Sequence, residues 1–235
     1  MTTNLLVLFL LILLCSPVCF AQTTSDKTDA KLSSMPVFEL SPEARAAGID
    51  GKLVINLTVG TDGKASGIRV FGTPMWPCGK EVKDALIEDV RDAVKQHLLL
   101  AKFEPAAKNG KPRSSDVQIT FLLTETFRRA NDVKAIQEGL KRGVIPELVE
   151  VKDIDRLAIS LPKQIIASGN PPSYRLTEMQ VMVDESGNVI SSGGLRAGQR
   201  ELREARKLLC AAKFKPLVIS QTATKMTGVV MYGLY

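Results

Sequence analysis

The chain contains the stretch Ala101-Lys102-Phe103-Glu104-Pro105 twice, the second time as Ala212-Lys213-Phe214-Lys215-Pro216. Sixteen positions after each proline, an aromatic residue lies in a β-rich run: Phe121 in the first copy and Tyr232 in the second. An apolar helical pattern precedes each copy, and a strand with a glycine turn lies further upstream. Because internal repeats fix the architecture of a chain, this repeat predicts two copies of one small α+β unit.

The first copy begins with a short helix and continues as a hairpin. Ser41 is placed to cap a helix that starts at Pro42 and stops at Gly48. Apolar and polar residues then alternate over 53–59, as in a half-buried strand, and Asp62-Gly63 is typical of a hairpin turn. A long helix is expected from about residue 80 to 101, with these residues on its apolar face: Ile87, Val90, Val94, Leu98 and Ala101.

The second copy repeats this order. A short helix is expected from Ser160-Leu161-Pro162 to Gly169, and Asn170-Pro171-Pro172 is inserted before the strand. The alternating strand residues match those of the first copy when both are counted back from the turn glycines Gly187 and Gly63: Thr177, Met179, Val181 and Val183 against Leu53, Ile55, Leu57 and Val59. A shorter helix follows, with these residues inward: Leu202, Ala205, Leu209 and Ala212.

The N-terminal segment has the pattern of an export signal. Residues 5–15 are continuously apolar and are followed by Pro17 and by small residues ending at Ala21. This predicts a signal peptide over 1–21 and a periplasmic protein. The apolar run is shorter than the about 20 residues of a membrane span, yet residues 1–4 lack Lys and Arg, so an uncleaved inner-membrane anchor is the alternative. Residues 22–37 are polar and are expected to form a disordered tether.

A helical segment links the two copies. Asn131 is placed to cap a helix with Val133, Ile136 and Leu140 inside and Gly143 at its end. The pattern leaves open whether this helix covers a sheet or acts as a spacer. The resulting division of the chain is a first domain over 38–127, a helical linker over 128–155 and a second domain over 156–235.

Cleavage of the signal would leave two cysteines, Cys78 and Cys210, in a compartment that permits disulfides. Cys210 lies four residues before Phe214, where the first copy has Leu99 before Phe103. A position that differs in this way is a candidate for contact with the other unit. The two thiols either form a bridge between the units or remain free, since bridging requires Cα atoms within about 7 Å.

Composition and motifs indicate no enzyme, cofactor, metal or nucleic-acid site. The 235 residues carry a net charge of +6 and one histidine, His97, on the flank of an apolar helix face, which favours a structural role. Arg200, Arg203 and Lys207 lie along one helix side with Glu201 and Glu204 interleaved, which is typical of a solvated face. No aromatic residues lie beside them to stack on nucleic-acid bases. Trp76, in a proline-flanked loop, is either a lid over the core or a binding anchor.

The order of elements resembles the C-terminal domain of TonB-family energy transducers. The resemblance is carried by residues 41–51, 62–63 and 101–105 in the first copy and by 183–187, 212–216 and 228–235 in the second. It implies two tandem small TonB C-terminal-like α+β domains, each a short antiparallel sheet with helices on one face. In that family the domain lies in the periplasm and binds a short peptide of outer-membrane transporters as an added strand.

The resemblance implies a periplasmic protein-binding module that acts by β-strand addition and is auxiliary to TonB-dependent transport across the outer membrane. Its partner would be a protein or peptide of the cell envelope, such as an outer-membrane transporter. The chain has Ser41-Pro42 in place of the usual Tyr-Pro, no proline-rich spacer and no histidine in its N-terminal segment. For this reason the resemblance is taken to imply the family's protein binding and not its force transduction. The alternatives are a membrane-anchored minimal TonB energy transducer and an envelope scaffold that binds peptidoglycan.

The final strand of each unit is expected at a sheet edge, because it follows a long helix and a loop. Its outward N–H and C=O groups would then be available to a partner strand. The candidate binding residues are Val117, Gln118, Ile119, Thr120 and Phe121 in the first unit and Val229, Val230, Met231 and Tyr232 in the second. Alternatively, the two units cover their edges by packing together as a pseudo-dimer, so that at most one edge per unit stays open.

Overall fold

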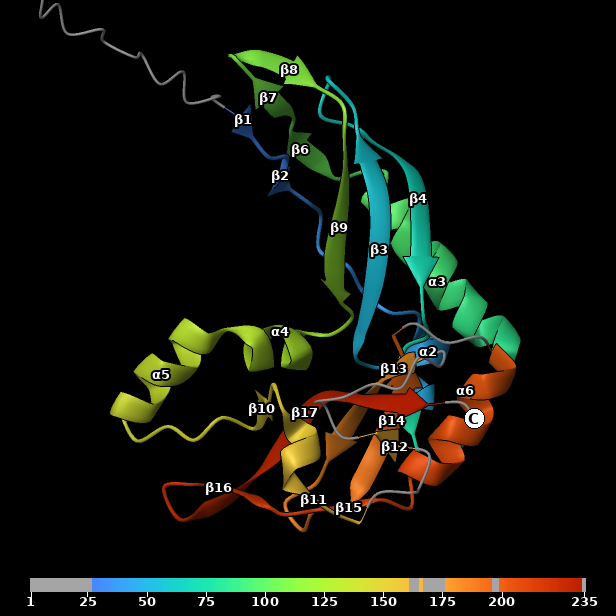
Figure 1. The fold of residues 1–235 in the computed structure, drawn as a ribbon, viewed down its shortest axis with the longest axis vertical. Coiled ribbons are helices and arrows are strands. Elements are labelled where there is room, and N and C mark those ends of the chain that lie inside the picture. The colour runs from blue at the N-terminus through green and yellow to red at the C-terminus, as the bar shows by residue number, and fades with distance from the viewer. Residues whose placement is uncertain (1–26, 161–164, 167–175, 196–198, 234–235) are drawn as a thin grey trace, which may run out of the picture.

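The computed structural model describes residues 27–160, 165–166, 176–195 and 199–233 (Figure 1). It is a mixed α+β chain with several small antiparallel sheets and a few helices. The expected signal peptide over 1–21 and the insertion at 170–172 lie outside the described residues. The helix expected at 160–169 is wrong where it is described, because Ser160 ends β11, Ala158–Ser160, and residues 165–166 form β12. No helix in the described part is long and apolar enough to cross a membrane.

The first sheet is antiparallel and carries a helix on one face. Its strand order is β4-β3-β9, with bounds Ala65–Phe71, Lys52–Val59 and Ser115–Leu122, and the helix α3 spans Asp84–Leu98. The alternation predicted for β3 is confirmed, because Leu53, Ile55, Leu57 and Val59 are at most 2% exposed and share one core with the apolar face of α3. The short helix α2, Pro42–Ala47, starts and stops as predicted: Ser41 Oγ accepts from Ala44 N at 3.1 Å, and Gly48 ends it at φ 72°.

The second sheet is larger, and both of its faces carry helices. Its order is β10-β17-β13-β14-β5, with bounds Leu148–Glu150, Thr222–Gly233, Leu176–Val183, Val189–Gly194 and Trp76–Pro77. Helix α6, Gln199–Leu209, packs on the face of Val181 and Val183. Helix α4, Glu125–Asn131, lies on the other face, where Phe127 and Met182 share a second apolar cluster. Successive strand residues point to opposite faces of a sheet, so Met182 lies on the face opposite to that of Val181 and Val183. Because Met182 packs with Phe127, α4 covers that face.

The predicted tether does not hold for residues 27–34, which form two short strands. β1, Lys27–Thr28, joins β7, Ala106–Lys108, and β8, Lys111–Arg113, in one sheet. β2, Lys31–Ser34, pairs with β6, Lys102–Glu104, and places Leu32 opposite Phe103. A polar composition predicted disorder here, but the backbone of β2 pairs with the repeated Lys-Phe stretch and that of β1 pairs with β7, which follows it. Residues 22–26 lie outside the described part.

The predicted helical linker over 128–155 is helical only at its start. After α4 comes α5, Val133–Lys141, which is capped by Asp132 and not by Asn131: Asp132 Oδ1 accepts from Ala135 N at 2.9 Å. Val133, expected inside, is 63% exposed. The end of the segment then belongs to the second sheet, because β10 pairs in parallel with β17 before the short 3₁₀ helix η1, Ile154–Leu157.

The repeated stretch makes the same contact in both halves. Phe103 N donates to Gly63 O at 3.0 Å, and Phe214 N donates to Gly187 O at 2.9 Å. The two turn glycines have φ of 75° and 84°, and a Cβ at either one would overlap the carbonyl oxygen of the facing phenylalanine. Each hairpin turn therefore docks on the Lys-Phe strand with backbone against backbone, and only glycine fits there.

A one-residue change tests this contact. Gly63→Ala is expected to lower the free energy of unfolding by about 3 kcal/mol or more, because it adds overlap with a backbone carbonyl to the cost of a left-handed conformation. Gly110→Ala is the matched control, since Gly110 has φ 73° but nothing within 4 Å of its Cβ position, and it should cost only about 1 kcal/mol. Urea unfolding measures both; equal losses would show that the docking contact contributes nothing.

The two halves join through a strand contributed by the first half to the sheet of the second. In β5, Trp76 lies opposite Ser192 and Pro77 opposite Ser191 of β14, and Cys78 N donates to Ile190 O at 2.9 Å. In the described part of the chain, the sheet edges of the two halves do not pair with each other; instead a short loop strand, β5, covers the outer edge of β14.

A buried glutamine ties β3 to the second sheet at the same junction. Gln180 on β13 is fully buried. Its Oε1 accepts from Lys52 N at 3.0 Å, and its Nε2 donates to Lys52 O at 2.9 Å and to Thr73 O at 3.0 Å. The side chain amide thus satisfies three backbone groups of the first half, which removes the cost of burying them unpaired.

A disulfide and a stacked arginine close the junction on the side of α6. Cys78 and Cys210 are joined by a disulfide with their Cα atoms 5.6 Å apart. Next to it the Arg206 guanidinium lies 3.8 Å from the ring centroid of the buried Trp76 and donates to Trp76 O at 2.8 Å and Ser192 O at 2.9 Å. Burial lowers the pKa of Arg206 to about 10, so it remains charged at neutral pH. Trp76 is accordingly a buried part of the junction.

The disulfide can be tested by peptide mapping of unreduced protein. A digest without reductant is expected to yield one linked peptide that contains Cys78 and Cys210, which are 132 residues apart. A cross-link that closes so long a loop adds roughly 4 to 5 kcal/mol to the free energy of unfolding in the chain-entropy model. Because Cys78→Ser and Cys210→Ser remove the same bond, both should lower the urea midpoint by the same amount. Recovery of both cysteines as alkylated free thiols would contradict the bond.

Candidate functional site

The outer edge of β9 is the candidate binding site. All eight residues of β9 pair with β3, from Ser115 opposite Val59 to Leu122 opposite Lys52. Among the described residues, no strand pairs with the other side of β9. In this register Leu123 N donates to Gly51 O at 3.0 Å, and hydrogen-bonded residues alternate along an antiparallel pair. The backbone groups of Asp116 and Thr120 therefore point away from β3.

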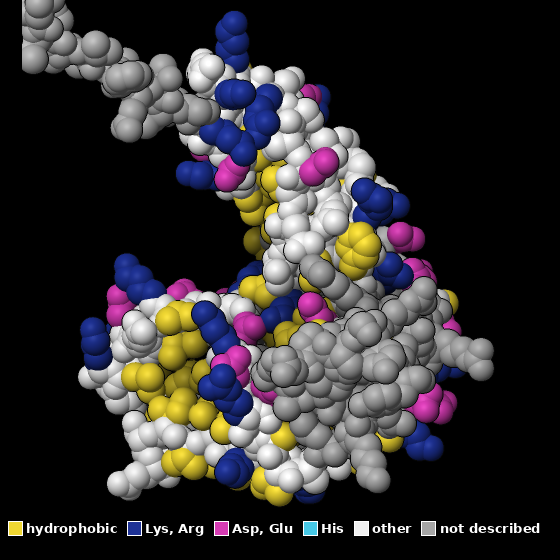
Figure 2. Space-filling view, in the orientation of Figure 1, with side chains coloured by type: hydrophobic (Ala, Val, Ile, Leu, Met, Phe, Trp, Pro, Cys, Tyr) yellow, Lys and Arg dark blue, Asp and Glu magenta, His cyan; other side chains and the backbone are white. Residues whose placement is uncertain are grey.

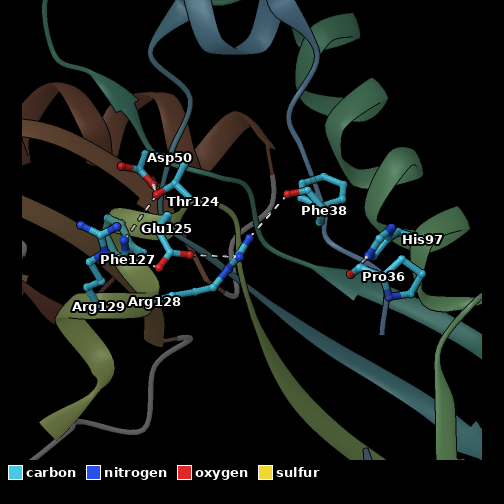
Figure 3. Close-up of polar contacts among 9 residues, drawn as sticks. All are labelled: Pro36, Phe38, Asp50, His97, Thr124, Glu125, Phe127, Arg128 and Arg129. Atoms are coloured by element: carbon cyan, nitrogen blue, oxygen red, sulfur yellow. Dashed lines mark hydrogen bonds and ion pairs between the residues drawn. The ribbon is translucent and has the colours of Figure 1, made fainter. Parts of the chain in front are cut away.

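The inner face of β9 holds the strand in place. Val117 and Ile119 are half-buried against the core, and Phe121 is 4% exposed, as expected for these positions. The Phe121 ring stands edge-on to Phe38 at 5.1 Å, and Phe38 packs in turn against His97 at 5.2 Å. His97 Nε2 also lies 3.0 Å from Pro36 O (Figure 3). His97 is therefore part of a ring cluster that anchors β9 from within.

The solvent face of β9 is polar and bonded to β3. Thr58 Oγ1 donates to Asp116 Oδ1 at 2.6 Å, and Gln118 Nε2 donates to Asn56 Oδ1 at 2.9 Å. The side chain of Thr120 is exposed on the same face. These bonds direct the side chains across the sheet face, so that contacts at the edge itself would be made by the backbone.

The end of β9 runs directly into α4, which fixes its position above the second sheet (Figures 1 and 3). Thr124 caps α4 and donates from Oγ1 to Asp50 Oδ1 at 2.5 Å, while burial raises the pKa of Asp50. Arg128 of α4 reaches Glu125 at 3.2 Å and Phe38 O at 3.5 Å. Figure 3 shows Arg128 extended between α4 and the segment that carries Phe38. The outer edge of β9 therefore ends at α4, which is held by Asp50 on one side and by the segment that carries Phe38 on the other.

The predicted second edge is wrong, because β17 lies inside its sheet. Val229, Val230, Met231 and Tyr232 all pair with β13 on one side. On the other side β10 covers Lys225 to Thr227, and β12, Ile165–Ile166, covers Met231 and Tyr232. β16, Leu217–Ile219, pairs with the start of β17. Val230 and Tyr232 are 1% exposed, so their side chains belong to the core.

The remaining candidate residues are structural where they are described. Arg203 lies on a solvated helix face as expected, with its side chain 68% exposed, and forms an ion pair with Asp84 on α3. The side chain of Arg200 lies outside the described part. Among the described residues, no group of three or more His, Cys, Asp or Glu side chains could hold a metal ion.

Comparison with known proteins gives few matches. No family model matches the chain, and no curated protein matches it. Among solved structures, the chain is similar to the solution NMR structure of the Pseudomonas aeruginosa TonB CTD, with 23% sequence identity and a TM-score of 0.29. That match covers 41% of this chain and 87% of the other. A likeness of this size does not establish the family.

Proposed function

We propose that the chain is a protein-binding module of the cell envelope that captures an extended segment of a partner as a strand beside β9. The observation that supports it is the position of β9: it is paired along its whole length with β3, anchored by Phe121, and without a strand partner on its outer side in the described part. An edge of this kind presents N–H and C=O groups that bind another strand.

The two faces of β9 indicate which segment fits. In an added strand, alternate side chains would lie beside the half-buried row of Val117 and Ile119, and the others beside the polar row of Asp116 and Thr120. An alternating apolar and polar segment would therefore satisfy both faces. Backbone hydrogen bonds would supply affinity, and the two rows would supply selectivity.

The location and the biological role form part of the same proposal. The disulfide between Cys78 and Cys210 favours an oxidising compartment, and the apolar run over 5–15 favours export. We place the protein in the periplasm, with tandem TonB-like units over 38–127 and 156–235 and an outer-membrane transporter as partner. The repeated contact of Gly63 with Phe103 and of Gly187 with Phe214 supports the duplication.

A proline scan of the edge tests the proposal. Synthetic peptides that carry the periplasmic segments of the host's outer-membrane transporters are the probe, with binding measured by calorimetry. Thr120→Pro removes the outward amide of Thr120 and should weaken binding roughly tenfold or more, since a strand hydrogen bond contributes about 1 kcal/mol and the ring obstructs the approach. Thr120→Ser keeps the amide and should bind within about twofold of the original.

Folding of the proline variant is checked first by circular dichroism and urea unfolding, because its effect must be on binding and not on the sheet. The donor lost from Thr120 points away from β3, so the β3–β9 ladder should survive. A folded Thr120→Pro variant that binds the same peptide with unchanged affinity would rule out strand addition at this edge.

A further inference from the structure

Basic side chains gather at the end of the molecule remote from the second sheet (Figure 2). We call this group the basic tip; its members are Lys27, Lys31, Lys102, Lys108, Lys111 and Arg113. Two acidic residues, Asp29 and Glu104, lie on the same strands and loops. None of the six cations forms an ion pair with a described residue. The basic tip therefore carries positive charge that the described fold does not neutralise.

The strand register sets three pairs of like charges opposite each other and one pair of opposite charges, Lys31 on β2 and Glu104 on β6. Lys27 on β1 lies opposite Lys108 on β7, and Lys108 lies opposite Lys111 on β8. A third pair, Lys64 and Lys102, faces across an isolated bridge. Side chains at such positions are about 5 Å apart at Cβ, and like charges there are destabilising. An anionic ligand would relieve this repulsion.

We propose that the basic tip binds the surface of an anionic phospholipid bilayer. The three-stranded sheet of β1, β7 and β8 protrudes at one end of the molecule (Figure 1), and a projecting cationic surface fits a flat anionic one better than it fits a folded acidic chain. Leu32 on the adjoining β2 is 48% exposed and adds an apolar group beside the charges.

The sequence places the basic tip near a membrane if the apolar N-terminal run is retained. Lys27 follows the apolar run over 5–15 by twelve residues, which reach at most about 40 Å when fully extended. If the run stays in the bilayer, the basic tip is held within reach of the lipid headgroups. If the run is removed, the same cations provide a peripheral contact that falls with salt.

This contact would also orient the proposed binding edge. β9 begins at Ser115, just after Arg113, and runs from the basic tip toward α4 (Figure 1). With the basic tip on the lipid, β9 and the second sheet would extend away from the bilayer. The lipid contact does not depend on strand addition at β9, so either proposal can fail alone.

The test measures the partition of the full chain between buffer and vesicles by cosedimentation. Phosphatidylcholine vesicles are compared with vesicles that also contain phosphatidylglycerol, at low and at high salt. The ratio of the two partition coefficients isolates the charge-dependent part, because the apolar run contributes equally to both. We expect a ratio well above one that falls toward one at high salt.

Two matched variants locate the effect. Lys108→Glu exchanges one attraction for one repulsion and should lower the ratio roughly thirtyfold. It also places opposite charges between Lys27 and Lys111, so urea unfolding should show unchanged or higher stability. Lys134→Glu changes the net charge equally on α5, where Lys134 is exposed and away from the basic tip, and should leave the ratio within about twofold.

Three outcomes would overturn the proposal. A ratio near one for the unmodified chain would show no preference for anionic lipid. An equal loss for Lys134→Glu would show that net charge and not the basic tip is responsible. Binding to poly-L-glutamate without any preference for phosphatidylglycerol would assign the basic tip to an acidic protein partner instead.

Discussion

The fold depends on the docking of each glycine turn onto the strand that contains the repeated Lys-Phe stretch. The phenylalanine amide donates to the glycine carbonyl, and the phenylalanine carbonyl occupies the space where a Cβ would lie at Gly63 or Gly187. This contact fixes the far end of each hairpin relative to the chain that leaves the long helix. The phenylalanine side chains, Phe103 and Phe214, are then directed into the core. The path that the backbone can take after the Lys-Phe strand then determines the order of the strands in each half.

The two halves share the docking of a glycine turn on a Lys-Phe strand, but their sheet edges are covered differently. In the second half β17 is enclosed by β10 and β12, and β14 is covered by β5 under the disulfide of Cys78. The covers come from three different segments: β10 from the expected linker, β12 from the residues before β13, and β5 from a loop of the first half. The segment that precedes each half pairs with its Lys-Phe strand in the same way: β2 pairs with β6, and β11, Ala158–Ser160, pairs with β15, Lys213–Phe214. In the described part of the first half, β9 has only β3 as a strand partner, so the two sheets differ in which edges are covered.

Buried strand faces and helix ends depend on local patterns of residues, and the sequence predicts them well. Alternation in β3 and β13 identified their buried faces, and the caps at Ser41 and Gly48 located α2 within one residue. The inner row of β9 was found in the same way. Local patterns did not reveal β10, β12 or β5, because strands of two or three residues are too short to show a period and gain their hydrogen bonds from partners far along the chain. Gln180 was missed for a related reason: its three partners lie more than 100 residues away.

An open strand edge must accept one partner and resist aggregation with others. In natural proteins, charged residues and short strand lengths prevent sheet edges from pairing with other chains. β9 carries Asp116 near its start, and Lys111 and Arg113 lie just before it. Its lower end is bounded by α4 and Arg128. The central residues around Thr120 are therefore the part where a strand can pair without opposing a charge. A short uncharged segment of a partner, as proposed for this edge, would fit these central residues without opposing a charge.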